Sequence, residues 1–329
     1  MKSLICPIII LIIISCTQQD IMIGRNILIK EFPQEINLSG EKLDITSIGV
    51  NNIFVVDTFL ICYKAMGLDE FFDIYSTNTY QSLGKFLSPG RGPNEFLNAT
   101  YMGQHFKDSS NTYMWIKDEA LMKLTLFNLT ESVKQQKTII DSSLFYHYFS
   151  FSNRNEYYSI YNRKTNTFIQ QDSIYRHSIN NIGNIFLWTT HSCYNLREQK
   201  YATAMEFLNQ INLYSLSQKK AISLVYNGNI SDLKKVEECP MPEKYTYYVD
   251  FTSTTKLLFG LYANQTRKDW ALKDNITTEI HVIDWEGIPK FKLNIQEKLS
   301  KIAINEKEKI MYGLTLEEEV YKYNLEEIL

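Results

Sequence analysis

The chain has 329 residues, of which 34 are Lys or Arg and 37 are Asp or Glu, so its formal net charge at pH 7 is −3. A mildly acidic chain lacks the basic surface that binds phosphate backbones, which excludes nucleic acid as an expected partner. Hydrophobic residues make up 44% of the sequence and aromatic residues 13%. This composition supplies an ample core and, because aromatic side chains favour strands, indicates a β-rich protein.

The first fifteen residues have the pattern of a secretory signal peptide. Lys2 carries the only charge before an apolar run from Leu4 to Ile14, which ends at Ser15-Cys16. A basic start, a short apolar run and a small residue at the cleavage point define such a peptide. The run is shorter than the roughly 20 residues that span a bilayer. A buried strand or an uncleaved anchor is the alternative interpretation.

The end of this run, Ile13-Ile14-Ser15-Cys16, resembles the bacterial lipobox. The resemblance implies cleavage before Cys16, diacylglycerol on its thiol and acylation of the new amine, and two or more acyl chains anchor a protein stably. We therefore expect a signal peptide at 1–15, a tether at 16–25 and a domain at 26–329. The expected location is the bacterial cell envelope, at the outer membrane, with the membrane as partner through the lipid anchor.

Three cysteines remain besides Cys6 and Cys16, namely Cys62, Cys193 and Cys239. No Cys-x-x-Cys pair occurs among them, which excludes a zinc ribbon, and we expect neither a metal nor a cofactor. One disulfide can form in an oxidising compartment, but we favour three buried thiols.

One type of alternating strand recurs with a mean spacing of about 50 residues, close to the period of propeller blades. It occurs at Phe71–Ser76, Leu124–Leu129, Ile211–Leu216, Glu279–Asp284 and Val320–Leu325, with a weaker copy at Thr167–Gln170. A second series follows turn-rich tetrads, at Ile53–Val56, Tyr113–Ile116, Tyr157–Tyr161, Ile185–Trp188, Leu257–Phe259 and Ile310–Tyr312. Both series count six, so the sequence predicts an all-β fold, a six-bladed β-propeller. The best helical pattern, Glu198–Asn209, is expected to be an insertion.

The sixth unit ends at Leu329 without an outer strand of its own. A spare alternating stretch, Asn26–Phe32, lies near the other end of the chain. We expect this N-terminal strand to pair with Val320–Leu325 and close the last blade, because closure pairs the open edges of the ring. Ile27 and Ile29 are then the inward-facing pair.

A glycine-rich loop follows the first repeated strand, where Gly90-Arg91-Gly92-Pro93 leads through Asn94 to Glu95-Phe96. With the lipobox and the six units, this loop resembles the six-bladed propeller lipoproteins of Bacteroidetes, which are described as TolB-like or NHL-like propellers of unknown function. The resemblance covers nearly the whole mature chain. It implies a fold and a location but no established activity, so the catalytic residues remain unknown.

The same loop has two interpretations. Backbone N–H groups around Gly90 and Gly92 can form an anion nest, with Arg91 supplying the charge. Alternatively, the glycines permit positive φ and Pro93 fixes the next turn, while Arg91 and Glu95 pair with each other. We favour the structural interpretation and retain Arg91 and Glu95 as weak binding candidates.

Recognisable catalytic motifs are missing from the sequence. It contains neither a His-Glu-x-x-His pair nor a Gly-x-Ser-x-Gly elbow, and neither a Walker loop nor a dinucleotide fingerprint. Asp57, Asp118 and Asp284 each end a predicted strand and can form a cation or acid/base site at a propeller mouth. Capping of turns is the interpretation that we favour for all three.

The sequence therefore favours a binding or interaction module over an enzyme, without identifying a ligand. The partner is expected to be a glycan, a small molecule or an envelope protein. The alternative is a propeller-type hydrolase or lyase that acts on an envelope or dietary glycan, for which two carboxylates, or a histidine and a carboxylate, should converge in one cleft. A purely structural envelope component is a third and weaker option.

Overall fold

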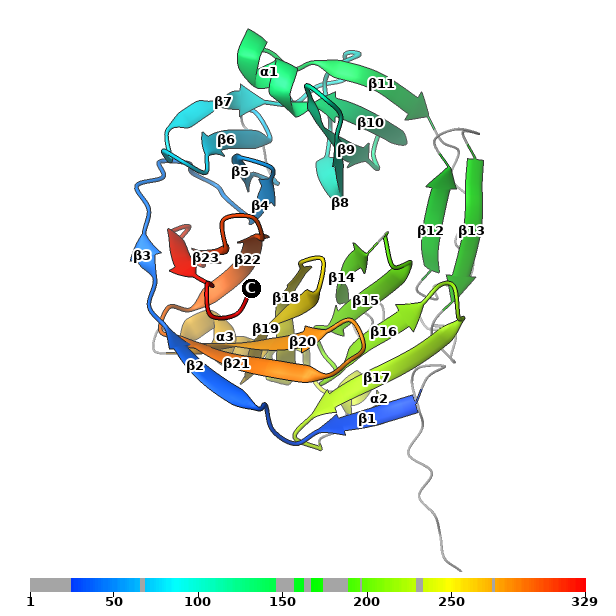
Figure 1. Ribbon diagram of the computed structural model, residues 1–329, viewed down its shortest axis with the longest axis vertical. Helices are drawn as coiled ribbons and strands as arrows, with labels where there is room; N and C mark the ends of the chain where they lie inside the picture. The colour runs from blue at the N-terminus through cyan, green and yellow to red at the C-terminus, as the bar shows by residue number, and fades with distance from the viewer. Residues whose placement is uncertain are drawn as a thin grey trace, which may run out of the picture.

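The computed structural model describes residues 25–65, 69–145, 157–162, 167–173, 189–195, 197–228, 233–273 and 276–329. These residues form six β-sheets that are arranged as the blades of a ring (Figure 1). The predicted all-β propeller is thereby confirmed. Blade 3 is described as a two-stranded sheet, which Figure 1 places between blades 2 and 4.

Each blade is an antiparallel meander that runs from an inner strand to an outer one. Blade 1 contains β4 (Asn52–Val56), β5 (Phe59–Tyr63), β6 (Phe72–Ser76) and β7 (Ser82–Phe86). Blade 2 contains β8 (Ala99–Lys107), β9 (Thr112–Asp118), β10 (Lys123–Asn128) and β11 (Ile140–Phe145), and blade 3 contains β12 (Tyr157–Asn162) and β13 (Thr167–Ser173). Blade 4 contains β14 (Thr190–Asn195), β15 (Lys200–Met205), β16 (Ile211–Ser215) and β17 (Lys220–Tyr226). Blade 5 contains β18 (Tyr245–Ser253), β19 (Leu257–Thr266), β20 (Thr278–Asp284) and β21 (Pro289–Ile295), and blade 6 contains β22 (Leu299–Asn305), β23 (Ile310–Thr315) and β24 (Val320–Asn324).

The helical elements are short and lie in the connections between strands. Those in the described part of the chain are α1 (Leu129–Gln135), α2 (Leu233–Glu238), the 3-10 helix η2 (Met241–Glu243) and α3 (Arg267–Leu272). Within the described ranges, none of the helices has the length and apolar character needed to cross a membrane.

The first predicted series of strands corresponds to β6, β10, β13, β16, β20 and β24, one in each blade. The second series is partly wrong. It finds β9, β12, β19 and β23, but Ile53–Val56 belongs to the inner strand β4, and residues 185–188 lie outside the described part of the chain. The predicted helix at Glu198–Asn209 is also wrong, because Lys200–Met205 forms β15 between β14 and β16. Tyr201–Met205 is buried throughout, so the strand lacks the polar face that would have shown an alternating pattern.

The N-terminal segment runs along the outer rim of three successive blades, and we call residues 25–42 the N-terminal belt (Figure 1, blue). β1 (Arg25–Ile29) adds in parallel to β17 of blade 4, and β2 (Gln34–Leu38) adds in parallel to β21 of blade 5. β3 (Glu41–Lys42) pairs antiparallel with β24 and closes blade 6. An N-terminal strand thus closes the last blade, as expected.

The predicted register of that closure is wrong. Lys42, not a residue of 26–32, stands opposite Tyr321, while Ile27 and Ile29 pair with blade 4. Both isoleucines nevertheless face inward: Ile29 is buried, and Ile27 packs against the hydrophobic cluster between blades 4 and 5. Each belt strand covers an outer edge that would otherwise expose unpaired backbone groups.

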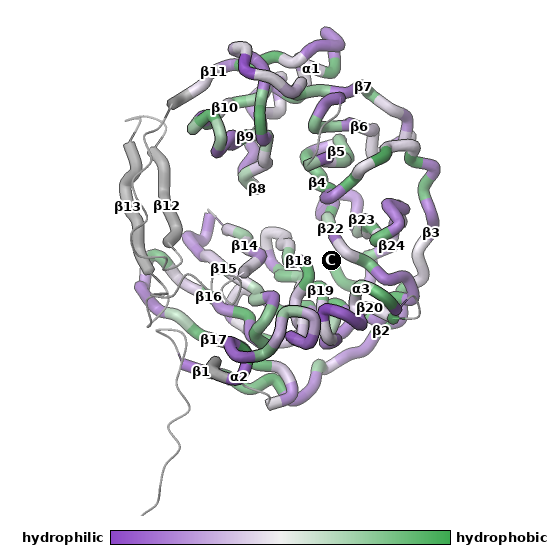
Figure 2. The backbone as a smooth tube through the Cα atoms, turned by 180° about the vertical axis from the view of Figure 1, so that it is seen from behind, coloured by the Kyte–Doolittle hydropathy of each residue, from purple (hydrophilic) through white to green (hydrophobic). Residues whose placement is uncertain are grey.

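The hydrophobic core is divided among the interfaces between neighbouring blades. Phe72, Phe86 and Phe127 pack between blades 1 and 2, and similar clusters join blades 4 and 5, blades 5 and 6, and blades 6 and 1. In Figure 2, hydrophobic stretches follow the strands of the blades, whereas hydrophilic residues gather in many of the turns. This packing holds the inner strands in fixed positions around the centre of the ring.

Candidate functional site

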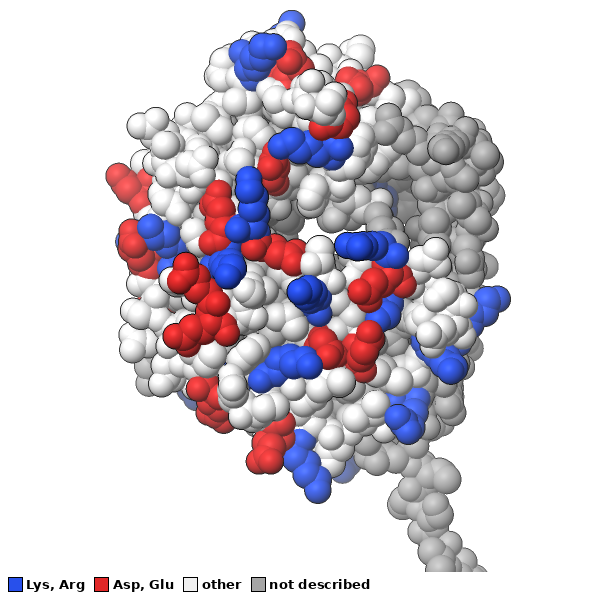
Figure 3. All heavy atoms as spheres, in the orientation of Figure 1, with Lys and Arg blue, Asp and Glu red and all other residues white. Residues whose placement is uncertain are grey.

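The inner strands of five blades enclose a cavity of about 750 Å³ at the centre of the ring. Its walls come from β4, β8, β14, β18 and β22, so residues far apart in the sequence meet there. Figure 3 shows one face of the ring, where positive and negative side chains surround the central hollow. Concave sites of a few hundred Å³ are where proteins usually bind small ligands.

Carboxylates at the cavity are compensated by the protein itself. Asp57, in the turn after β4, lies 2.6 Å from the Lys107 ammonium and accepts a hydrogen bond of 3.2 Å from the Thr112 hydroxyl. Burial raises the pKa of Asp57, but the hydrogen bond and charge of Lys107 outweigh it and lower the pKa overall. Glu306, in the turn after β22, accepts hydrogen bonds from the backbone and hydroxyl of Thr255.

A histidine and a carboxylate meet in the wall formed by β14 and β18. The distance from His191 Nδ1 to Asp250 Oδ1 is 3.8 Å. Asp250 also accepts a hydrogen bond of 2.8 Å from the Ile302 backbone and lies 3.4 Å from the Lys301 ammonium. Burial within the ring, aided by the charge of Lys301, lowers the pKa of His191 to about 4, so its imidazole is neutral at pH 7.

The inner strand of blade 2 is interrupted by a bulge that lines the cavity. Tyr101 pairs with Ile116 and His105 with Met114, so Met102–Gln104 stand opposite a single residue of β9. Gly103 has φ +69°, and a Cβ atom there would meet nothing within 4 Å. Bulges occur often beside active sites, where they redirect side chains.

The residues at the base of this bulge form a polar pair. The Tyr101 hydroxyl and His105 Nδ1 share a hydrogen bond of 2.8 Å, and the Tyr101 ring meets Phe54 edge-on at 4.9 Å between centroids. Burial raises the pKa of Tyr101 and lowers the pKa of His105, although Asp57 opposes the latter effect. Both side chains are therefore neutral at pH 7 while they line the cavity.

Arg91 and Glu95 lie in the connection between blades 1 and 2 and are absent from the cavity wall. The Gly92 N–H donates to the Glu95 carboxylate at 2.7 Å, and the Gly90 N–H donates to the Phe96 carbonyl at 2.9 Å. The loop thus uses these two N–H groups internally. Arg91 is exposed and has no ion pair with the part of the chain that the structure describes, so the expected Arg91–Glu95 pair is absent there.

Two contacts hold the loop in this conformation. Gly90 has φ +152°, a conformation that residues with a side chain rarely adopt, and a Cβ atom there would also meet the Glu95 carboxylate, so glycine is favoured at this position. The buried Lys123 ammonium donates to the Glu95 carbonyl at 2.7 Å and lies 4.0 Å from the centroid of the buried Phe96 ring. Burial lowers the pKa of Lys123.

The three strand-end aspartates do not converge. Asp118 accepts hydrogen bonds from the backbones of Leu97, Asn98 and Leu121, and Asp284 accepts them from Glu286 and Ile288. Both therefore cap turns, whereas Asp57 alone of the three lines the cavity. In the described residues, no group of three or more His, Cys, Asp or Glu side chains has the arrangement of a metal site.

Cys62, Cys193 and Cys239 are free thiols. Cys62 is buried, and the desolvation raises its pKa to about 12. Cys193 and Cys239 are only partly buried, which corrects the expectation of three buried thiols. Cys16 lies outside the described residues.

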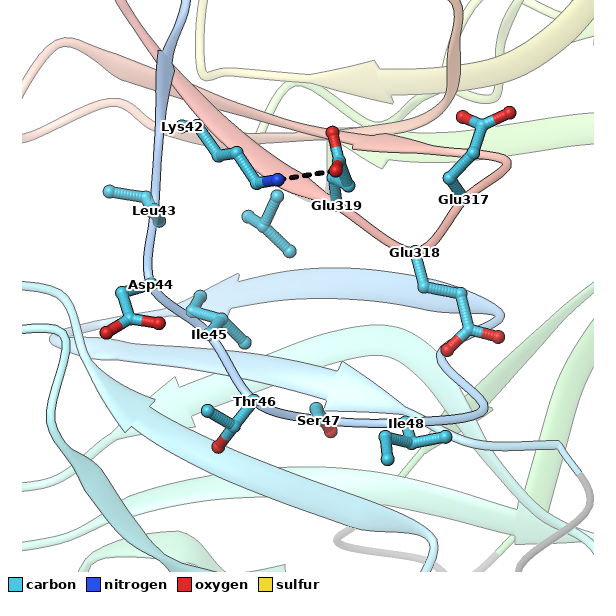
Figure 4. A pocket seen from close by; sticks show the side chains of 11 residues that line it. Lys42, Leu43, Asp44, Ile45, Thr46, Ser47, Ile48, Glu317, Glu318 and Glu319 are labelled. Atoms are coloured by element: carbon cyan, nitrogen blue, oxygen red, sulfur yellow. Dashed lines mark hydrogen bonds and ion pairs between the residues drawn. The ribbon is translucent and has the colours of Figure 1, made fainter.

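A second cavity of about 580 Å³ lies between the segment that follows β3 and the turn between β23 and β24 (Figure 4). Two of its four acidic side chains hold the two segments together. Glu319 pairs with Lys42, and Glu318 accepts a 2.6 Å hydrogen bond from the Gly49 backbone. These contacts fix the entry to blade 1 and leave the central cavity as the stronger candidate.

The sequence did not identify the cavity residues Tyr101, His105, His191, Ser192 and Asp250 as a site. They come from three strands of three blades, and only the closed ring brings them together. One signal was present: Gly103 inside an alternating strand indicates a bulge.

A family model described as "TolB-like 6-blade propeller-like" matches residues 48–307. A crystal structure of a DUF4221 family member from Bacteroides vulgatus is similar, with a TM-score of 0.55 and 10% identity over 87% of this chain and 97% of that one. A candidate exported protein from Bacteroides fragilis has a TM-score of 0.52 and 12% identity over 88% of this chain and 98% of that one. Sequence identities this low show that the folds are similar and nothing more. No curated protein matched the sequence.

Proposed function

The chain belongs to the TolB-like 6-blade propeller family, and from that premise we propose that it is an exported, lipid-anchored binding module whose ligand occupies the central cavity. The observation that carries the proposal is the cavity itself, which has a volume of about 750 Å³ and walls from five inner strands. Propellers bind ligands at such concave centres because neighbouring blades supply side chains from several directions.

The location of this module rests on its N-terminal sequence. The apolar run and the Ile-Ile-Ser-Cys ending favour lipid attachment at Cys16 and transfer to the outer membrane of the cell envelope. The similarity to a candidate exported protein supports export. The partner is a glycan, a small molecule or an envelope protein.

The binding function can be tested by blocking the cavity. Ser192 is exposed in the cavity wall, so Ser192→Trp should fill part of the space. Ser110→Trp, in the exposed turn between β8 and β9, is the matched control. The full chain, purified in detergent, would be incubated with an envelope extract, and retained compounds identified by mass spectrometry. Compounds retained by the parent and by Ser110→Trp should not be retained by Ser192→Trp. If Ser192→Trp retains the same compounds as the parent, the proposal is refuted.

One observation favours a second candidate, a hydrolase or lyase that acts on a glycan. His191 and Asp250 lie together in the cavity, which is the pairing of histidine and carboxylate expected of an enzyme. A neutral imidazole can act as a general base. If the parent returns a compound that is chemically altered and His191→Gln returns it unaltered, the enzymatic function is the correct one.

A further inference from the structure

The cavity has no uncompensated carboxylate among the residues that line it. Asp57 pairs with Lys107, Asp250 lies beside Lys301 and the Ile302 N–H, and Glu306 is bound by Thr255. Lys307 also lines the cavity, and its positive charge helps to lower the pKa of Asp57. A cationic ligand would lose its hydration in this cavity without gaining a free carboxylate, and among the lining residues an anionic ligand would meet only the exposed Lys307 ammonium, so an ion gains little there.

The remaining polar wall consists of neutral groups that both donate and accept hydrogen bonds. They are hydroxyl and imidazole side chains on three inner strands, at Thr100, Tyr101, His105, Thr190, His191, Ser192, Thr252 and Ser253. Hydroxyl groups can match either role, so they suit a ligand whose own groups are hydroxyls. This chemistry is complementary to a sugar and not to an ion.

The bulge of β8 adds an apolar contact to this neutral wall. Met102 remains 36% exposed although it lies inside the ring, and the Phe54 and Tyr101 rings meet close by. A flexible thioether adapts to irregular apolar surfaces, such as the C–H face of a sugar ring. The open space at Gly103 leaves room for a ligand to reach the backbone of the bulge.

We propose that the cavity binds an uncharged, hydroxyl-rich ligand of the class of neutral oligosaccharides, and that Tyr101, Met102 and His105 contact it. This proposal rests on the binding function proposed above and specifies its ligand. The neutral wall selects against ions, the hydroxyl and imidazole groups pair with sugar hydroxyls, and the bulge supplies the apolar platform. A cavity of about 750 Å³ is within the size range of small-ligand sites.

The test uses defined probes and the full chain in detergent. Neutral probes are maltohexaose, cellohexaose and mannohexaose; the anionic probe is hexagalacturonate and the cationic probe is chitosan hexamer. Affinity is measured by titration calorimetry at low and high salt. At least one neutral hexaose should bind, with a dissociation constant that is insensitive to salt because no ion pair is formed.

Two variants with matched controls place the binding at the bulge. Met102→Ala should weaken the affinity about tenfold, a difference of ~1.4 kcal/mol. Met122→Ala, which alters a methionine of nearly equal exposure (37%) in the β9–β10 turn of the same blade, should not. Tyr101→Phe should also weaken binding, whereas Tyr113→Phe should leave it unchanged. Parent-like affinity in both cavity variants would overturn the proposal.

The failure of this inference can be distinguished from failure of the binding function. The ligand class is wrong, although the cavity remains a binding site, in either of two cases. In the first, none of the neutral hexaoses binds while affinity selection still returns a compound whose retention depends on Ser192. In the second, a charged hexamer binds in preference and Ser192→Trp abolishes its binding. If affinity selection yields no compound whose retention depends on Ser192, the binding function itself is wrong.

Discussion

The ring of Phe32 lies 4.8 Å, centroid to centroid, from the imidazole of His281. Phe32 is in the link between β1 and β2, and His281 is a residue of β20 with 1% exposure. The rings of Tyr226 and Tyr262 enclose the same imidazole at 4.5 and 4.3 Å. The N-terminal belt is therefore joined to the core between blades 4 and 5, and its contacts should contribute to the stability of the ring.

Ile29→Ala tests the contribution of the belt. Ile29 is 6% exposed in the cluster between blades 4 and 5, so its truncation should lower the free energy of unfolding by about 2–5 kcal/mol. The control is Leu28→Ala in the same strand, where the side chain is 48% exposed and the loss should be within about 0.5 kcal/mol. Urea denaturation measures both, and equal losses would show that the belt strand is not packed as described.

His281 should make stability depend on pH. Burial lowers its pKa below 6.5, although Glu279, 3.6 Å away, opposes the effect. Below pH 6.5 the unfolded chain binds a proton that the folded chain does not, so stability is retained above that pH and lost as the pH falls. The loss from this residue is at most about 1.4 kcal/mol per pH unit in that range.

The corresponding measurement compares the parent with His281→Phe, which keeps an aromatic ring in the same place. The free energy of unfolding of the parent should fall between pH 7.5 and 5.5, and the variant should lose less over the same interval. His191, whose pKa is also lowered, accounts for part of the remaining slope. Identical slopes in parent and variant would contradict a neutral, buried His281.

The glycine-rich loop gives a third prediction. Glu95→Ala removes the acceptor of the Gly92 N–H and should cost about 1–3 kcal/mol in unfolding free energy. Arg91→Ala removes an exposed side chain and should change stability by no more than about 0.5 kcal/mol. Thermal unfolding measures both. Should Arg91→Ala abolish ligand retention while the melting temperature is preserved, the loop and not the cavity would be the binding site.

The repetition of strands could be predicted from the sequence because each blade contains one strand in which apolar and polar residues alternate, as they do in β20. β15 was misread as a helix, since Tyr201–Met205 is buried throughout and shows no polar face. The register of the belt could not be predicted, because β1 and β17 are far apart in the sequence: Arg25 pairs with Ile222. For the same reason the cavity was not foreseen: the distance between His191 and Asp250 depends on how blades 4 and 5 pack, which no local pattern encodes.

Lipid attachment at Cys16 is tested independently of the ring. Expressed in a bacterium with a lipoprotein-processing pathway, the protein should incorporate a palmitate analogue and partition into detergent, because the thiol forms the thioether to diacylglycerol. Cys16→Ala should lose both properties, whereas Cys239→Ala, which alters a partly exposed cysteine, should keep them. Equal labelling of Cys16→Ala and the parent would refute the anchor.

Hydrogen–deuterium exchange with the ligand recovered by affinity selection tests the central claim most directly, because it reports on all three candidate sites at once. Binding in the cavity should slow exchange in peptides that contain the inner strands, above all Ala99–Lys107 with its bulge and Thr190–Asn195. Exchange should stay unchanged in the glycine-rich loop at 88–96 and in the segment at 43–48 beside the acidic cavity. Protection confined to either of those two segments, with none in the inner strands, would contradict the account.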